Sequence, residues 1–127
     1  YVANEPGLPC RHCLQEIAEG DEFLILSYKP FETEQPFAEQ GPIFLHAKEC
    51  DAYSDQNNLP EMYEPENQTL LRGYSRHDRI VYGTGQVVTN RDINQAAKEI
   101  LATKGVQYIH ARSATNNCFQ FRIDRKS

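Results

Sequence analysis

Two cysteines separated by two residues near the start of the chain constrain the fold more than any other feature of the sequence. Residues 8–28 read LPCRHCLQEIAEGDEFLILSY, so Cys10 and Cys13 precede a turn at residues 19–21 and then an apolar run. A gap of two residues lets both sulfurs face a single ion, as in zinc-binding knuckles at the start of a hairpin. The motif therefore favours a metal site, a redox dithiol or a pair of buried thiols.

A second pair of metal-binding residue types follows further along the chain. The segment HAKEC contains His46 and Cys50, which completes the pattern C-x2-C-x32-H-x3-C. The spacer contains a predicted strand and a loop, so the two pairs can converge. Structural zinc takes four Cys and His ligands in a tetrahedron. We therefore expect a closed zinc site with the ligands Cys10, Cys13, His46 and Cys50. Cys118 or His12 could replace one of these ligands.

Two other interpretations of the first cysteine pair stay open. A redox CxxC motif normally opens a helix, whose N-terminus lowers the pKa of the first thiol. Here Pro9 precedes the motif and a turn follows closely, which leaves room for less than two helical turns, although Arg11 and His12 would stabilise a thiolate. In the remaining interpretation the cysteines are small buried apolar residues without a partner.

Charge is distributed unevenly along the chain. The net charge is −5, but residues 1–70 contain 3 Lys/Arg against 14 Asp/Glu, whereas residues 71–127 contain 10 against 4. The negative net charge and the absence of a recognisable motif argue against nucleic-acid binding. Either the acidic half complements the basic half, or the basic half presents a face that receives an anionic ligand.

The hydrophobic pattern predicts an α+β fold. Residues 23–28 predict a strand covered on both faces, and residues 42–46, 69–75 and 79–88 predict further strands. Residues 90–103 predict a helix with one apolar stripe, capped by Thr89 or Asn90. Residues 106–112 and 118–123 predict a hairpin. We expect one domain over residues 1–127, with a mainly antiparallel sheet, one principal helix packed on it, and long loops that include an exposed segment at 29–41.

The predicted hairpin separates its residues onto two faces. Phe119, Phe121 and Ile123 share a face with Ile109 and Ala111, which we assign to the core. The opposite face is either solvated or the floor of a ligand site, and it collects Tyr108, His110, Arg112, Cys118, Gln120 and Arg122. Residues 72–79 add further arginines around a turn, where guanidinium groups could bind a phosphate or carboxylate. The candidate residues for an unknown small anionic ligand or protein partner are Arg72, His110, Arg112 and Arg122.

A thiol-dependent enzyme is an alternative function. Cys118 and His110 could meet across the hairpin as a thiolate–imidazole pair. Asn116 or Asn117 could orient the imidazole or donate to an oxyanion. The local sequence matches no thiol-protease signature, so whether the chain is an enzyme stays open.

The sequence also suggests a compartment. No apolar run reaches the roughly 20 residues that span a bilayer, and no signal peptide is visible. We therefore expect a cytoplasmic protein with reduced cysteines and no membrane partner. Because the chain begins at Tyr1 and not at Met, we expect that an N-terminal segment of the full-length protein is missing.

Four segments in this order carry a family resemblance: PCRHCL, GPIFLHAKEC, LLRGYSRHDRIVYG and YIHARSATNNCFQFRIDR. Together they resemble the bacterial domain of unknown function 1203 family over residues 5–125. The resemblance implies a single-domain soluble bacterial protein, usually with a further N-terminal segment, and no established activity. It draws attention to residues 9–11, 41–44, 72–74, His110 and 118–119. It leaves open a zinc site particular to this protein, or a shared site around Cys10, His110, Arg112 and Cys118.

Overall fold

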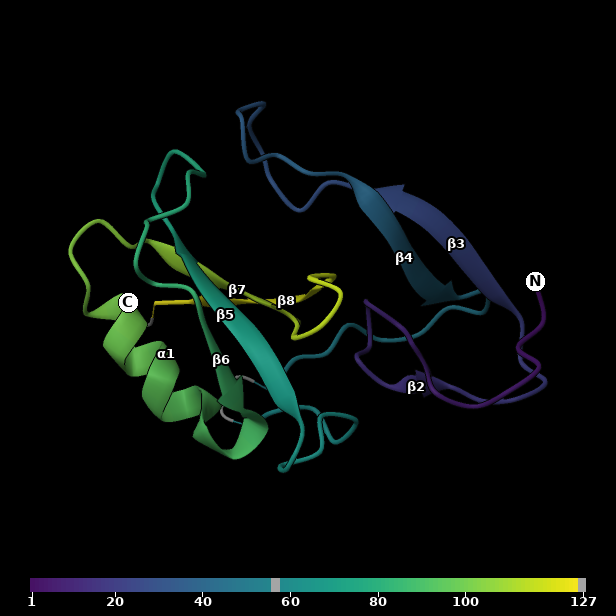
Figure 1. Cartoon of the computed structure of the whole chain (residues 1–127). Coiled ribbons are helices and arrows are strands. Elements are labelled where there is room, and N and C mark those ends of the chain that lie inside the picture. Colours follow the sequence, from purple (N-terminus) through teal and green to yellow (C-terminus); the bar gives the residue numbers. More distant parts are fainter. Residues whose placement is uncertain (56–57, 126–127) are drawn as a thin grey trace. The chain divides into compact units, whose positions relative to one another are not determined.

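The computed structural model describes residues 1–55 and 58–125, which form two compact units. Unit 1 contains Tyr1–Tyr28 and Gln40–Glu64, and unit 2 contains Lys29–Glu39 and Pro65–Ser127. All strand pairs in the described part are antiparallel, and one helical segment accompanies them (Figure 1). The predicted α+β class with one principal helix is confirmed, while a single domain over residues 1–127 stays a prediction.

Unit 1 consists of two short ladders around a small core. Strands β1 (Leu8–Pro9) and β2 (Glu16–Ile17) pair on either side of the first cysteine motif, and β3 (Phe23–Tyr28) pairs with β4 (Gly41–His46). The buried cluster contains Ala3, Cys10, Cys13, Ile17 and Phe23, with Leu8, Phe44, Leu45 and Cys50 packed against it. Three of the four cysteines therefore belong to the core of unit 1.

Strand β3 is more exposed than its sequence suggests. The apolar run predicts a strand covered on both faces, and the strand forms, but Leu24, Ile25 and Leu26 are 44–45% exposed. In the described part of the chain β3 has one hydrogen-bonded neighbour, β4. The prediction of two covered faces is therefore wrong. An apolar run shows that a strand favours burial, but it does not show whether another layer of the protein covers that strand.

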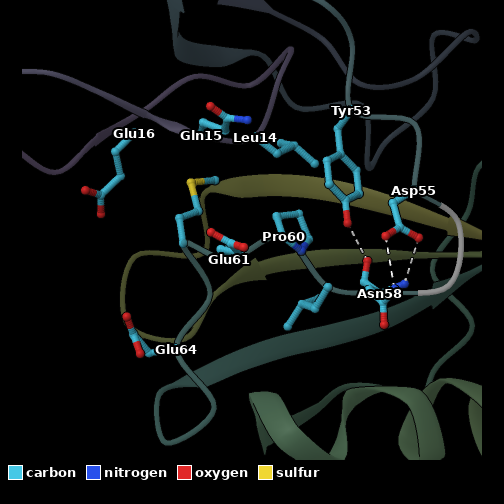
Figure 2. A pocket seen from close by; sticks show the side chains of 11 residues that line it. Leu14, Gln15, Glu16, Tyr53, Asp55, Asn58, Pro60, Glu61 and Glu64 are labelled. Carbon is cyan, nitrogen blue, oxygen red and sulfur yellow. Dashed lines mark hydrogen bonds between the residues drawn. The ribbon is translucent and has the colours of Figure 1, made fainter.

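A pocket of about 750 Å³ opens in unit 1. In its wall the Tyr53 hydroxyl donates to the Asn58 carbonyl at 2.6 Å, and the Asn58 side chain donates to Asp55 at 3.0 Å (Figure 2). The carboxylates in its lining belong to Glu16, Asp55, Glu61 and Glu64. Like charges repel, so this pocket does not suit an anionic ligand.

Unit 2 is a four-stranded sheet with a helix on one face. The strand order is β6 (Gln86–Thr89), β5 (Gln68–Tyr74), β7 (Tyr108–Ser113) and β8 (Phe119–Asp124). A 3-10 turn, η1 (Asn90–Asp92), leads into α1 (Ile93–Leu101), which packs against β5 and β7 (Figure 1). The predicted apolar stripe is confirmed, since the buried residues of α1 are Ile93, Ala96, Ala97 and Ile100.

Two local predictions around the helix differ in part from the structure. Thr89 precedes the helical segment but makes no side-chain cap hydrogen bond, and its hydroxyl donates to the Asp92 carboxylate at 2.7 Å instead. Of the predicted strand at 79–88, residues 86–88 belong to β6, and Ile80 forms an isolated bridge with Tyr74. A turn interrupts the rest, with Gly83 at a φ of 90° and the Thr84 hydroxyl donating to the Val81 carbonyl at 2.6 Å.

The last hairpin contains a bulge that changes one face assignment. Ile109 pairs with Ile123 and Ala111 with Phe121, as the sequence predicts, but the register shifts between Ala111 and Arg112. Arg112 therefore pairs with Phe119, whose ring contacts His110 with centroids 4.8 Å apart. A bulge inserts one residue into the alternation of side chains, so the assignment of Phe119 to the same face as Phe121 is wrong.

Candidate metal centre and basic face

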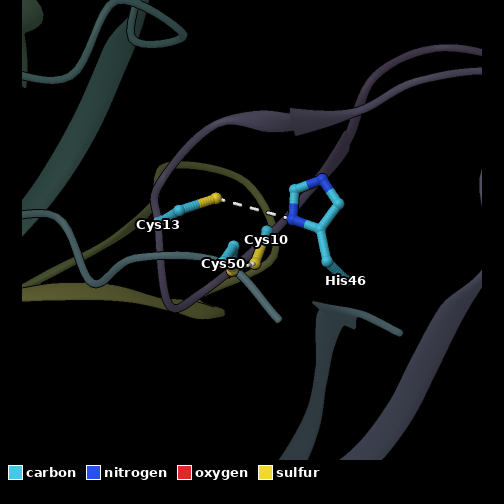
Figure 3. Close-up of side chains that lie close together, drawn as sticks. All are labelled: Cys10, Cys13, His46 and Cys50. Atoms are coloured by element: carbon cyan, nitrogen blue, oxygen red, sulfur yellow. Dashed lines mark hydrogen bonds between the residues drawn. The ribbon is translucent and has the colours of Figure 1, made fainter. Parts of the chain in front are cut away.

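The four predicted metal ligands lie together in unit 1. The ligand atoms of Cys10, Cys13, His46 and Cys50 all lie within 4.8 Å of one another. The Cys10 and Cys50 sulfurs are 3.9 Å apart, and the Cys13 sulfur is 3.5 Å from His46 Nδ1 (Figure 3). The cluster thus presents three sulfurs and one ring nitrogen to a common centre.

The first pair of ligands is placed by the tight turn between β1 and β2. The Leu14 amide donates to the Cys10 carbonyl at 3.0 Å, and the Cys10 amide donates to the Gln15 carbonyl at 2.9 Å. Leu14 closes this turn in the left-handed region, with a φ of 56°. A residue with a Cβ adopts that conformation at a cost of about 1–2 kcal/mol. The turn therefore holds a strained residue next to Cys13, as expected where surrounding interactions fix the backbone.

Backbone hydrogen bonds bring the second pair of ligands to the first. His46 ends β4, and the Arg11 amide donates to the Phe44 carbonyl of the same strand at 3.0 Å. Beyond Cys50, the Tyr53 amide donates to the His12 carbonyl at 3.0 Å. Residues flanking both ligand pairs are thus connected through the main chain.

Two of the separations between ligand atoms match those of a small tetrahedral ion. With metal–sulfur bonds of about 2.3 Å and metal–nitrogen bonds of about 2.0 Å, neighbouring ligand atoms of a tetrahedral site stand roughly 3.5–3.8 Å apart. The two measured separations, 3.9 and 3.5 Å, are close to these values. A soft set of three thiolates and one imidazole suits zinc and other thiophilic ions and does not suit calcium or magnesium.

The three thiols of the cluster have very different acidities. Burial raises the pKa of Cys10, but hydrogen bonds from the backbone amides of Cys13, His46 and His12 outweigh it and bring that pKa to about 6. Desolvation and the adjacent Cys10 and Cys13 sulfurs raise the pKa of Cys50 to about 12. Desolvation, with the neighbouring Cys10, also raises the pKa of Cys13. A second negative charge is costly here unless a cation compensates it.

The surroundings of CRHC differ from those of a dithiol redox site. Redox CxxC motifs use the N-terminus of a helix to stabilise the thiolate. Residues 11–13 form a turn within the loop joining β1 to β2, and the helical segment in the described part of the chain lies in unit 2. His46 and Cys50 complete a four-ligand set instead.

The four predicted ligand-binding residues lie on one face of the sheet in unit 2, which we call the basic face. Arg72 on β5, His110 on β7 and Arg122 on β8 are cross-strand neighbours in one row. Arg112 lies two residues from His110 on the same strand and donates to the His110 ring at 3.1 Å. His110 and Arg112 are fully buried, so the basic face is not a solvated surface at its centre.

Aromatic rings surround the buried histidine. The centroids of Phe31, Tyr74, Tyr108 and Phe119 lie 4.7–5.3 Å from that of His110. Desolvation, followed by the charges of Arg112 and the neighbouring arginines, lowers the pKa of His110 to about 3. The imidazole is therefore neutral at physiological pH and can donate through one nitrogen only.

Cys118 and His110, the predicted thiolate–imidazole pair, are not hydrogen-bonded to each other. Cys118 is exposed, and its sulfur lies 3.8 Å from the Asn116 carbonyl. The His110 Nδ1 atom instead faces the Arg112 guanidinium. Asn117 presents its backbone carbonyl to the same guanidinium at 3.0 Å. No hydrogen bond in the described part of the chain supports the proposed nucleophile.

The segment Lys29–Glu39 contributes side chains to the basic face that the sequence did not identify. We call this segment the strap. Glu39 accepts from both terminal nitrogens of Arg112, one of them at 2.8 Å, and Phe31 packs against Tyr74 and His110. The strap is acidic and contains proline, which predicts an exposed loop. The signal that was missed is Phe31, because phenylalanine is among the residues most often buried, and Phe31 is buried here.

Fold and site together define a small α+β protein with a Cys3His cluster in one unit and a basic face in the other. A family model described as "Protein of unknown function" (DUF1203) matches residues 7–125, so the chain belongs to that family. No curated protein and no solved structure matches the chain. Among the described residues, no helix is both long enough and apolar enough to span a membrane.

Proposed function

We propose that this protein is a binding module with a structural zinc ion in unit 1 and an anion-binding face in unit 2. The observation that carries the zinc assignment is the convergence of four ligand atoms within 4.8 Å. Four protein ligands leave no position for water or substrate, which is typical of structural and not of catalytic zinc. Small units bury little hydrophobic area and often gain stability from a structural metal. An ion bound by Cys10 and Cys13 would stabilise the core of unit 1, because both residues belong to that core.

The basic face supports the second part of the proposal. Four cationic or donor side chains, Arg72, His110, Arg112 and Arg122, occupy neighbouring positions on three adjacent strands. Guanidinium groups bind carboxylates and phosphates through paired hydrogen bonds. A structural site in one unit and a ligand face in the other require no catalytic residue, so the proposal does not depend on Cys118.

Metal analysis of the purified protein tests the zinc assignment. We expect about one equivalent of zinc per chain in protein prepared without chelators, and a large loss of zinc in Cys50→Ala. Cys118→Ala is the matched control, because Cys118 is exposed and lies outside the cluster, and it should retain zinc. Less than a tenth of an equivalent in the unmodified protein, with all four thiols titratable, would contradict the assignment.

A further inference from the structure

The basic face contains two buried hydrogen-bond donors that lack an acceptor. Arg112 donates to His110 Nδ1, so the proton of the neutral ring is on Nε2. Within residues 1–55 and 58–125, His110 Nε2 and Arg112 Nε have no hydrogen-bond partner, although both side chains are fully buried. Native proteins pair almost all such groups. These two donors are therefore available for an acceptor that the chain itself does not provide.

A carboxylate of the chain already occupies the fork of Arg112. Glu39 accepts from both terminal nitrogens of that guanidinium, in the paired arrangement by which arginine recognises a free carboxylate. The side chain of Arg112 is 1% exposed and that of Glu39 is 39% exposed. The carboxylate thus reaches a buried cation from the solvent side, as an external ligand would.

Further side-chain contacts attach the strap, which carries Glu39, to the rest of unit 2. Phe31 packs on Tyr74 with ring centroids 5.3 Å apart and on His110 at 4.9 Å. The Thr33 hydroxyl donates to Asp78 at 2.8 Å. No regular secondary structure forms between Lys29 and Glu39, so side-chain contacts hold the segment over the basic face. A segment held in this way can detach without breaking the sheet.

We propose that the basic face is a carboxylate-binding site in which Glu39 takes the place of the ligand. An incoming small organic acid exchanges with the Glu39 carboxylate on Arg112, and the strap opens to admit it. The inference rests on the anion-binding face proposed above and names its ligand class. Carboxylate is chosen over phosphate because the group that occupies the guanidinium fork in this structure is itself a carboxylate.

Removal of the competing carboxylate tests the exchange. We expect Glu39→Gln to bind acetate at least tenfold more tightly than the unmodified protein in titrations at constant ionic strength. Glu34→Gln is the matched control, because Glu34 belongs to the same strap but pairs with Lys29, and it should leave the affinity unchanged. Equal acetate affinity in both variants would overturn the inference. Tighter binding of inorganic phosphate than of acetate by Glu39→Gln would overturn the ligand class.

A measurement on the unmodified protein covers the case in which the variant does not fold. Acetate should shift the NMR signals of the Arg112 Nε–H group and of the strap amides, and unchanged signals at saturating acetate would overturn the exchange. Arg122→Gln separates the two proposals. If Arg122→Gln weakens anion binding but Glu39→Gln does not change it, the anion-binding face is supported and the exchange with Glu39 is rejected. Absence of anion binding in every protein tested would reject both.

Discussion

At the scale of single residues, His110 shows how burial can change the chemistry of a side chain. The groups that face it are Arg112 on its own strand, Arg72 and Arg122 on the neighbouring strands, and Asp78, whose negative charge raises its pKa. Burial and the three arginines nevertheless lower that pKa from 6.5 to about 3. A histidine is usually the group that titrates near neutrality, and here it acts as a fixed neutral donor.

We predict that unit 2 loses stability in acid through His110. The unfolded chain takes up a proton near pH 6.5 and the folded chain does not, so this stability is complete above pH 6.5 and is lost as the pH falls towards 3. The loss is at most about 1.4 kcal/mol for each pH unit. NMR of the imidazole should show no titration of His110 between pH 8 and 5. A midpoint within that range would contradict the prediction.

The residue types of the metal cluster could be predicted from sequence, but the contacts of the basic face could not. Residue types that bind thiophilic ions are few, so the spacing predicted the group Cys10, Cys13, His46 and Cys50, whose ligand atoms lie together in the structure. The sequence left Cys118 and His12 open as replacements for one member. The contact between Glu39 and Arg112 joins residues 73 positions apart. Any of the acidic residues in the first half of the chain could have made it. Only the path of the strap across the sheet determines which one does.

At the scale of elements, the packing of α1 on the sheet depends on a glycine in β5. A Cβ placed on Gly73 would lie 3.0 Å from Thr84 Oγ1, 3.1 Å from Val106 Cγ2 and 3.2 Å from Ile100 Cγ2. The Gly73 amide also donates a hydrogen bond to the Thr84 hydroxyl oxygen at 2.9 Å. The close approach of strand, helix and turn therefore requires the absence of a side chain at this position.

We predict that Gly73→Ala destabilises unit 2 by about 1–3 kcal/mol, the usual cost of overpacking a well-filled core. Gly41→Ala is the matched control, because Gly41 also lies in a strand and a Cβ there would meet nothing within 4 Å. Its free energy of unfolding should change by less than about 1 kcal/mol. Urea denaturation of both variants measures the difference, and equal stabilities would show that the sheet and helix can separate to admit a methyl group.

The elements themselves differ in how far the sequence could predict them. The apolar stripe of α1 has a period that few other structures produce, and the helix was predicted within two residues at its C-terminal end. The bulge at Ala111 and Arg112 left no comparable signal, because alternation in each strand continues on both sides of it. Pairing depends on the partner strand as well as on the sequence of one strand.

At the scale of the whole molecule, the two units differ in how much secondary structure stabilises them. Unit 2 has a four-stranded sheet with a helix on one face, whereas unit 1 has two separate two-stranded ladders. A two-stranded ladder alone is marginally stable in water. The buried cluster of unit 1 includes two of the proposed zinc ligands. If zinc is bound, much of the stability of unit 1 should depend on it.

We therefore predict that removal of zinc affects the two units differently. After chelation, hydrogen exchange should become faster by at least a hundredfold at the amides of Arg11, Leu14 and Tyr53, whose hydrogen bonds hold the ligand loops. A binding free energy of about 10 kcal/mol would allow a larger change. The amides of β7 in the sheet of unit 2 should retain their protection, which serves as the internal control.

Uniform acceleration of exchange in both units would mean that they fold as one cooperative structure. Unchanged exchange in unit 1 would mean that the cysteine cluster is stable without a metal. Only the selective result agrees with a zinc ion that stabilises unit 1 and leaves the stability of unit 2 unchanged.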